Sequence, residues 1–593
     1  MWATGRRVLL AHSKLAAHAK QIQSPGKQVY ATAAAIKPET VRRAQFVLNR
    51  PVKPDSVHRD LSPSTEHGGS HFWNFQDELL GLAEERQGDP VYKSSSLNMD
   101  VLYRSGETSQ GILTYCPRLL SIGYKAEPRE KNIFLQSLCE EETENLTSNV
   151  ADQGSSHPQR QITDKERIEC LENGVQYWTD FSKVQFHPRS LYELHGSWTD
   201  VEKFDNYGIG EEILSAGFQS EEMNERLRFF IEECDHIQGI QFIVDDSGGF
   251  SAIAAGFLEE IADEYSNTPV LLYSARSPAS YKLGKSPKES VSRALHDAVS
   301  FSRLSSCCKL MVPVGLPSLS RSKFSSTLFV EDQKLFHSSA IYAASIHSIS
   351  IPFRMESHGV NAESLYVSGA MDVGGMVQML AGQARQNMIT ILDLAMPAQF
   401  LNDSNNQSTI LRSLCSLTPE IEENNDDLHS IESLIVHGAF SGGRRASISE
   451  VEKYIHTEYQ NELPRPMLYH LTAASCPLPI PLPFPSIFNN RVGRLGELST
   501  AQLAGAERRG SLEVESVPMA ARLRSSSAIK PIIERRLGSL RRYGLQRGAL
   551  GVELLRSWGF GKEEVEDMGE ALEKMMMLLD PNAYAASSDF DSD

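Results

Sequence analysis

The chain has 593 residues, of which 40% are hydrophobic and 23% are charged, and its formal net charge is -18. This composition supports a large buried core and excludes a chain that is disordered throughout. The negative charge argues against a protein that binds nucleic acid through bulk positive charge. No apolar run approaches the roughly 20 residues that a helix needs to cross a bilayer, so no transmembrane segment is expected. The eight cysteines include no C-x-x-C pair, which disfavours a disulfide framework and a structural zinc site.

Residues 1–69 form a basic, acid-poor leader that contains many alanines, and up to Lys53 the only acidic residue is Glu39. This composition is typical of an organellar transit segment. Several prolines make the leader irregular, so an unstructured tail and an atypical first exon stay open as alternative interpretations.

Residues 70–355 are predicted to form a core in which helices and buried strands alternate. Apolar residues recur at helical spacing in His71–Leu80 and again in Glu221–Cys234. A polar stretch at residues 140–165 is interpreted as a surface insertion or linker.

The middle of this core has the order strand, tight turn, helix, strand. Ile240–Val244 and Val270–Tyr273 are short apolar runs typical of buried parallel strands, and Ser251–Tyr265 between them has a helical pattern. This succession predicts an α/β fold with a mostly parallel sheet that is flanked by helices.

Residues 356–593 are predicted to form a second, α+β domain with a helical carboxy terminus. Proline alternates with apolar residues in the connector at residues 476–485, which predicts an extended, packed crossover rather than a central strand. A ligand for an SH3-type domain is the alternative interpretation of this segment. Helices are predicted over Ile529–Tyr543 and Val552–Leu579.

The turn Asp245–Gly249 is the most informative candidate site. A glycine-containing turn between a strand and a helix presents free backbone N–H groups, which is the physical basis of many phosphate sites. Asp245 and Asp246 would repel a polyphosphate unless a metal ion lay between them. The residues therefore favour a structural connection, and a metal-assisted phosphate site is the alternative.

Other catalytic and metal-binding templates are absent from the sequence. It contains no G-x-x-x-x-G-K-[ST], no G-x-S-x-G and no H-E-x-x-H, so no catalytic residue is assigned. His67 and His71 are four residues apart, but the glycines between them are expected to break a helix, so a zinc pair is not expected.

The central motifs resemble tubulin. Cys234–Gln241, the glycine turn and Asp263–Tyr265 are similar to the tubulin pattern C-D-x-L-Q-G-F-Q, G-G-G-T-G-S-G, E-E-Y. Phe204–Gly210 falls where tubulins have an asparagine- and glycine-containing nucleotide loop. Met311–Pro313 resembles the M-V-P strand that follows the tubulin central helix.

The more specific resemblance is to the tubulin-related Misato family. The matching phrases, in order, are S-H-F-W-N-F-Q-D-E at Ser70–Glu78, D-V-L-Y-R at Asp100–Arg104, T-Y-x-P-R-L at Thr114–Leu119, H-P-R-S at His187–Ser190, E-E-C-D-x-x-Q-G at Glu232–Gly239 and P-L-P-F-P at Pro481–Pro485. The resemblance implies a tubulin/FtsZ-like fold. It also implies a role in mitochondrial distribution, morphology and inheritance, with a further link to chromosome segregation.

The chain departs from the tubulin phosphate loop. Gly249 stands at the threonine position, and Ser247 and Phe250 stand at glycine positions. No N-x-D-F-x-D catalytic loop follows Met311, so the attacking water would lack an orienting acid. GTP is the one cofactor that the resemblance implies. The residues of this degenerate nucleotide site are Ser247, Gly248, Gly249, Ser251 and Asn206.

A second departure precedes the first core helix. Tubulin-like proteins have an opening strand of the type E-I-V-x-I-Q-x-G there, and Val41–Leu48 is the only, and poor, substitute. An empty central slot would leave many backbone groups without hydrogen bonds.

We therefore expect a tubulin-like protein that organises mitochondria without efficient GTP hydrolysis. It would lie in the cytoplasm and at the mitochondrial outer surface and bind protein partners there or on the cytoskeleton, with peripheral membrane association and import through the leader left open. Arg535, Arg536, Arg541 and Arg542, beside Leu537 and Leu540, are the candidate docking surface. The alternatives are a GTP-binding cytoskeletal protein or GTPase, and an assembly factor for cytoskeletal subunits.

Overall fold

The computed structural model of the chain describes sixteen segments. They are residues 43–44, 64–85, 88–93, 97–107, 113–124, 164–175, 178–194, 204–215, 217–281, 286–355, 367–381, 388–398, 409–421, 430–461, 465–499 and 501–579. Most of the predicted leader and of the predicted insertion at 140–165 lies outside these residues.

A parallel sheet forms the centre of the tubulin-like part. Strands β7 (Ile240–Val244), β8 (Val270–Ala275) and β9 (Leu310–Val314) are adjacent in that order and are buried along their whole length. A second parallel pair joins β4 (Ser121–Tyr124) to β5 (Leu191–Leu194). Strands buried on both faces read as continuous apolar runs, so the predicted parallel α/β fold is confirmed.

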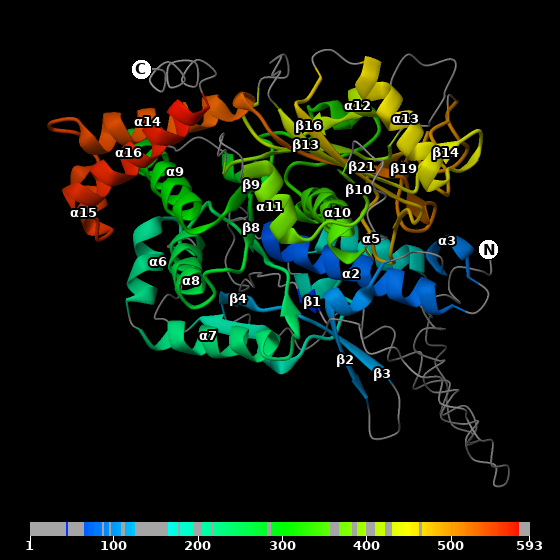
Figure 1. Cartoon of the computed structure of the whole chain (residues 1–593), viewed down its shortest axis with the longest axis horizontal. Helices are drawn as coiled ribbons and strands as arrows, with labels where there is room; N and C mark the ends of the chain where they lie inside the picture. Colours follow the sequence, from blue (N-terminus) through cyan, green and yellow to red (C-terminus); the bar gives the residue numbers. More distant parts are fainter. Residues whose placement is uncertain are drawn as a thin grey trace, which may run out of the picture.

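Helices cover both faces of this sheet (Figure 1). Leu271 and Val312 pack in the core that contains the long helices α2 (Ser64–Glu84) and α10 (Leu335–Arg354). Leu272 and Met311 pack in a second core on the opposite face. The helices of that face are α6 (Tyr207–Leu214), α7 (Phe218–Ile231), α8 (Phe250–Glu264) and α9 (Pro287–Cys307). The two-residue period of a strand thus divides the apolar residues between two helical layers.

Helix α2 overturns one prediction from the sequence. Gly68 lies inside the helix, so the glycines between His67 and His71 do not break it. A helical glycine costs about 0.5–1 kcal/mol, which the complete burial of Phe72 and Trp73 outweighs. His71 is buried and its Nε2 donates to the Phe336 carbonyl at 3.2 Å. No cluster of His, Cys, Asp and Glu that could hold a metal ion exists within the described residues.

Helix α10 runs between the two sheets and is buried from Phe336 to Arg354. It contacts α2 more extensively than any other element and also touches β13 and β21 of the second sheet. Because β9 precedes α10, the prediction that Met311–Pro313 follows the central helix is wrong.

The second sheet has six strands, and both parallel and antiparallel pairs occur in it. Helix α13 (Ile448–Asn461) shares one core with this sheet, and α10 lies in the core of the opposite face. In spatial order the strands are β10 (Val367–Ser368), β16 (Leu468–Ala474), β13 (Ile431–His437), β21 (Met519–Ser525), β11 (Ile391–Ala395) and β12 (Cys415–Ser416).

The proline-rich connector is packed inside the protein. Leu478 and Phe484 are fully buried, and β17 (Leu478–Pro479) pairs with β20 (Ser516–Val517). A buried connector is the predicted crossover, and its burial argues against the SH3-ligand interpretation because a ligand segment must be accessible.

The carboxy-terminal helices are α14 (Lys530–Leu540), α15 (Val552–Ser557) and α16 (Lys562–Leu578). The predicted single helix over 552–579 is therefore wrong. Gly559 adopts a φ of +93°, which ends the helix, and Trp558 turns inward until its side chain lies against Gly208 of α6.

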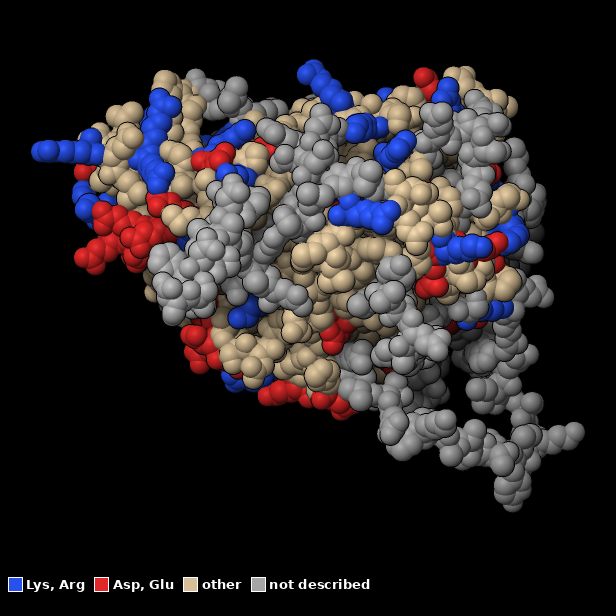
Figure 2. Space-filling model, turned by 45° about the horizontal axis from the view of Figure 1, so that its top comes forward, with Lys and Arg blue, Asp and Glu red and all other residues tan. Residues whose placement is uncertain are grey.

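The predicted docking surface on α14 is also wrong in part. Leu537 and Leu540 are buried, and Arg536 is buried beside Glu420. Arg541 forms an ion pair with Glu573. Figure 2 shows basic and acidic side chains side by side at this end of the molecule, so the surface is of mixed sign.

The remaining described helices and strands are short or peripheral. Strand β1 (Arg43–Ala44) pairs in parallel with β6 (His236–Ile237), and residues 45–48 of the predicted substitute strand lie outside the described part. No helix among the described residues is both long and apolar enough to cross a bilayer. The others are α3 (Pro90–Lys93), β2 (Tyr103–Glu107), β3 (Leu113–Pro117), α5 (Asp164–Gly174), α11 (Val373–Ala381), α12 (Ile410–Ser413), β14 (Phe440–Ser441), β15 (Arg444–Arg445), β18 (Phe488–Asn489) and β19 (Arg508–Arg509).

Buried histidines make the stability of the fold depend on pH. Burial lowers the pKa of His71 to about 3 and the pKa values of His437 and His470 to about 4. Below a pH of about 6.5 the unfolded chain binds protons that the folded chain refuses, so stability falls as the pH falls. Lowering the pH from about 7.5 to about 5.5 should cost about 1.4 kcal/mol for each of these histidines.

Thermal unfolding at these two pH values measures the effect. In His437→Gln the decrease in Tm should be smaller than in the unchanged protein, since one proton-linked group is gone. A Tm that does not change with pH in this range would contradict the prediction.

Candidate functional site

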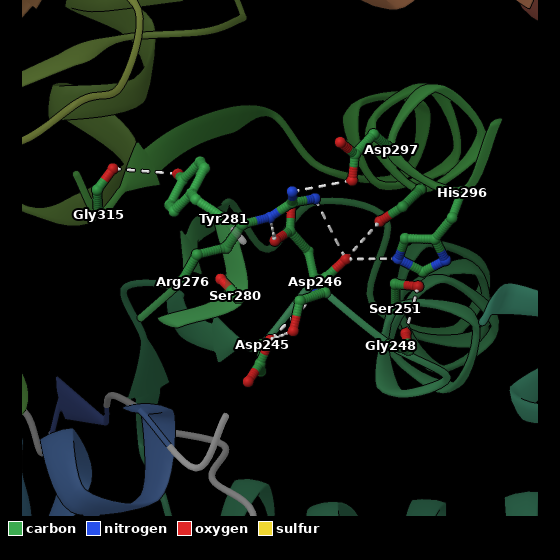
Figure 3. Close-up of polar contacts among 12 residues, drawn as sticks. Asp245, Asp246, Gly248, Ser251, Arg276, Ser280, Tyr281, His296, Asp297 and Gly315 are labelled. Atoms are coloured by element: carbon green, nitrogen blue, oxygen red, sulfur yellow. Dashed lines mark hydrogen bonds and ion pairs between the residues drawn. The ribbon is translucent and has the colours of Figure 1, made fainter. Parts of the chain in front are cut away.

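The turn between β7 and α8 is closed by hydrogen bonds of its own residues. The Asp245 carboxylate accepts from the backbone N–H of Ser247 at 3.0 Å and from its hydroxyl at 2.5 Å. This is the local ring that Asp forms in turns. The Ser251 hydroxyl is buried and donates to the Gly248 carbonyl at 2.8 Å (Figure 3). Both hydroxyl groups predicted to face a phosphate are thus engaged within the turn.

Phe204 covers the two glycines of the turn. Its carbonyl accepts the Gly249 N–H at 3.1 Å, the type of donor that a phosphate site would offer. A Cβ on Gly248 would come within 2.5 Å of this carbonyl, and a Cβ on Gly249 within 2.8 Å of the Phe204 ring. The ring is buried and lies 4.9 Å from that of Phe250. Glycine is therefore required here for the close approach of Phe204.

Asn206 caps the helix that follows Phe204. Its side-chain oxygen accepts the Ile209 N–H at 3.4 Å, at the first turn of α6. An N-cap of this kind satisfies one of the open backbone donors of a helix. The structure thus brings the predicted site residues together, because Asn206 follows Phe204 on the segment that covers the glycine turn. The side chains of Asn206, Ser247 and Ser251 are, however, each engaged in a local structural hydrogen bond.

A buried ion-pair cluster holds the turn from the other side. The Arg276 guanidinium lies between Asp246 and Asp297, forming an ion pair with Asp246 and a 2.8 Å contact with Asp297 (Figure 3). His296 of α9 donates from Nε2 to the Asp246 carbonyl at 2.8 Å. Burial by itself would raise the pKa of Asp297, but the charges of Arg276, Arg536 and His296 and the hydrogen bond from Arg276 together lower it. The cluster places two carboxylates around one cation.

The same contacts bear on the metal-assisted alternative. A metal ion at Asp246 would have to displace Arg276, and one at Asp245 would bind a carboxylate whose Oδ1 already accepts both donors of Ser247. Within the described residues no group of three or more His, Cys, Asp or Glu side chains could hold a metal ion. These residues do not fit a metal site.

Sequence reasoning missed Phe204 and Arg276. Arg276 follows β8, and the aspartates follow β7, its parallel neighbour in the sheet. Because the carboxyl ends of adjacent parallel strands share one edge of the sheet, their placement could have predicted this ion pair. The resemblance to tubulin placed the segment Phe204–Gly210 near the glycine turn, but nothing in the sequence indicated that the Phe204 ring covers the glycines.

The segment searched for a catalytic acid has another role. Asp332 accepts the backbone N–H groups of Leu319 and Ser320 at 2.8 and 3.0 Å and the hydroxyls of Ser318 and Ser320. This segment lies between β9 and α10, whereas residues 356–366, which follow α10, lie outside the described part of the chain. The missing motif after Met311 is therefore no test of the loop that follows the central helix.

Family models and known proteins that are similar to this chain agree with one another. A family model described as "Tubulin domain" matches residues 169–355, and one described as "Misato Segment II tubulin-like domain" matches residues 64–173. The mouse protein "Protein misato homolog 1" is 27% identical over 564 residues, which cover 86% of this chain and 94% of the mouse protein. The cattle protein of the same name is 27% identical with the same coverage. The fungal "Protein DML1" of Gibberella zeae is 28% identical over 55% of this chain and 67% of its own.

Removal of the central cation should destabilise the protein strongly. Arg276→Met would remove the main counter-charge of Asp246, which is buried, and of Asp297, which is partly buried, at a cost of about 3–5 kcal/mol. Chemical unfolding followed by circular dichroism measures this loss. Adding Asp297→Asn should restore part of the stability, because one of the two uncompensated charges is then removed.

The matched control is Arg228→Met, which removes an arginine from an exposed ion pair with Glu264. Such pairs contribute little because water screens them, so Tm should stay unchanged. Equal effects of the two arginine substitutions would contradict the proposed role of the buried cluster.

Proposed function

Because the chain belongs to the Misato family of tubulin-like proteins, we propose that it acts in the distribution, morphology and inheritance of mitochondria. In this proposal it is a protein-binding scaffold in the cytoplasm and at the mitochondrial outer surface, without efficient GTP hydrolysis. The family relationship supports the mitochondrial part. The geometry of the turn after β7 supports the non-catalytic part.

The observation that carries the non-catalytic part is the position of Phe204. A phosphate at this turn would have to displace the Phe204 carbonyl from the Gly249 N–H and its ring from both glycines. Losing that hydrogen bond costs about 0.5–1.5 kcal/mol, and exposing the phenyl ring costs about 1.5–3 kcal/mol. Together these terms would weaken nucleotide binding by roughly 30- to 2,000-fold.

Charge, like steric exclusion by Phe204, disfavours the binding of a nucleotide at this turn. Asp246 is already balanced by Arg276, which it shares with Asp297, so this cation cannot also neutralise a triphosphate. The scaffold would therefore interact through its surfaces with other proteins, while its tubulin-like part remains rigid.

Calorimetric titration of the full chain with GTP and magnesium tests the non-catalytic part. We expect no saturable heat for the unchanged protein, and weak magnesium-dependent binding to appear in Phe204→Ala if the ring and its segment are the barrier. A control variant should change the turn without disturbing the fold. Gly248→Arg does not meet this condition, because any Cβ at this position meets the Phe204 backbone. Ser247→Ala meets it, since this side chain bonds only within the turn. Tight GTP binding by the unchanged protein would refute the non-catalytic part and favour a GTP-dependent switch.

Depletion of the protein in the cells that produce it tests the mitochondrial part. Mitochondria should become clustered and unequally inherited, as seen by fluorescence microscopy of a matrix marker. Re-expression of the unchanged chain and of Ser247→Ala should both restore the network, because the scaffold does not depend on nucleotide contacts. A normal mitochondrial network in fully depleted cells would contradict this role.

A further inference from the structure

A cleft of about 400 Å³ lies beside β11 and β12, at one edge of the second sheet. One wall is the single helical turn Lys323–Ser326, which lies between β9 and α10 in the chain. The other wall comes from beyond α10, from the end of β11 and from α12, with Leu498 completing it. The cleft is therefore built by segments from both sides of the central helix. Its volume lies within the range of sites for small organic ligands.

The floor of the cleft is apolar. Its lining includes Phe324, Leu394, Met396 and Leu498. Phe324 and Leu394 are buried at 2% and 0% exposure, so their positions are fixed by the core behind them. Above this floor the half-buried Leu498 offers accessible apolar surface for an aromatic ring or a short aliphatic chain.

The rim of the cleft is cationic and rich in hydroxyl groups. Lys323 and Arg412 line it together with four serine and threonine side chains, and none of the described lining residues is acidic. Arg412 lies on α12 and is exposed, and no ion pair joins it to another described residue. In a chain with a net charge of -18, the described lining of this cleft has two basic residues and no acidic one.

We propose that this cleft binds a small amphipathic anion, in which a carboxylate, sulfonate or phosphate group is joined to an aromatic or short aliphatic part. The anionic group lies at the rim near Arg412, whose planar guanidinium suits such groups, and the apolar part lies on the floor. The ligand contacts both walls, so its binding stabilises the arrangement of the two sheets around α10. The inference does not rest on the mitochondrial role or on the state of the β7–α8 turn.

The test uses two dyes of nearly the same shape. Anilinonaphthalene sulfonate carries an anionic group on an apolar ring system, and phenyl-naphthylamine is the same ring system without the sulfonate. We expect the full chain to bind one equivalent of the sulfonate, seen as a saturable rise in fluorescence and a rise in Tm. The neutral dye should bind more weakly.

Three variants locate the binding. Arg412→Glu should weaken the sulfonate by about tenfold or more, which corresponds to the loss of one hydrogen bond to a charged group, and should leave the neutral dye unchanged. Leu498→Asp, at a half-buried floor position, should weaken both dyes. Arg491→Glu is the control, because Arg491 is exposed but does not line the cleft.

The outcomes separate the proposal from adventitious dye binding. Equal effects of Arg412→Glu and Arg491→Glu, or several weak equivalents of dye without a rise in Tm, would overturn it. Circular dichroism of each variant establishes that the fold is retained. If Leu498→Asp fails to fold, Arg412→Glu with the dye pair decides the question, because Arg412 is an exposed side chain.

Discussion

Helix α10 is buried along its length, so its polar side chains depend on hydrogen bonds inside the protein. His347 shares a hydrogen bond of 2.8 Å with Gln76 of α2, and Arg354 donates to the same glutamine. Ser348 and His437 of β13 are 3.0 Å apart. A buried polar group without a partner costs several kcal/mol, so a shift of the helix that broke one of these bonds would be unfavourable. Both sheets and the first core helix are placed relative to these few contacts.

The network extends from α10 to the two features that shape the rest of the molecule. Tyr342 donates to the Arg276 carbonyl at 3.0 Å, so the cation that holds the β7–α8 turn is itself held by the central helix. The other ring nitrogen of His437 forms a hydrogen bond of 3.0 Å with the Cys476 carbonyl, at the start of the proline-rich connector. Burial lowers the pKa of Arg354 to about 10, which leaves it charged at neutral pH in the middle of the protein.

Strands were predicted correctly from the sequence where complete burial requires a continuous run of apolar residues. Ile240–Val244 and Val270–Tyr273 are apolar throughout, and a strand buried on both faces has no other way to be encoded. Prediction from the sequence failed where tertiary contacts override local preference, as at Gly68, where the packing of α2 on α10 outweighs the helix penalty of glycine. It also failed at Met311–Pro313, because three matching letters carry too little information to distinguish one strand from another. The sequence predicted where the candidate site lies, but not that a side chain of the protein fills it. The glycines at 248 and 249 suggest room for a ligand, and only the fold shows that Phe204 takes it.

The contact between Trp558 and Gly208 joins the carboxy-terminal helices to the tubulin-like part of the chain. Gly208 lies four residues after Phe204, in the first turn of α6, and the ring of Tyr207 lies 5.4 Å from that of Phe560. The break between α15 and α16 is therefore fastened to the segment that covers the glycine turn. The carboxy-terminal helices are thus packed, through Trp558 and Phe560, against the segment that carries Phe204. A change in the position of these helices would therefore reach the covering of the glycine turn without passing through the central sheet.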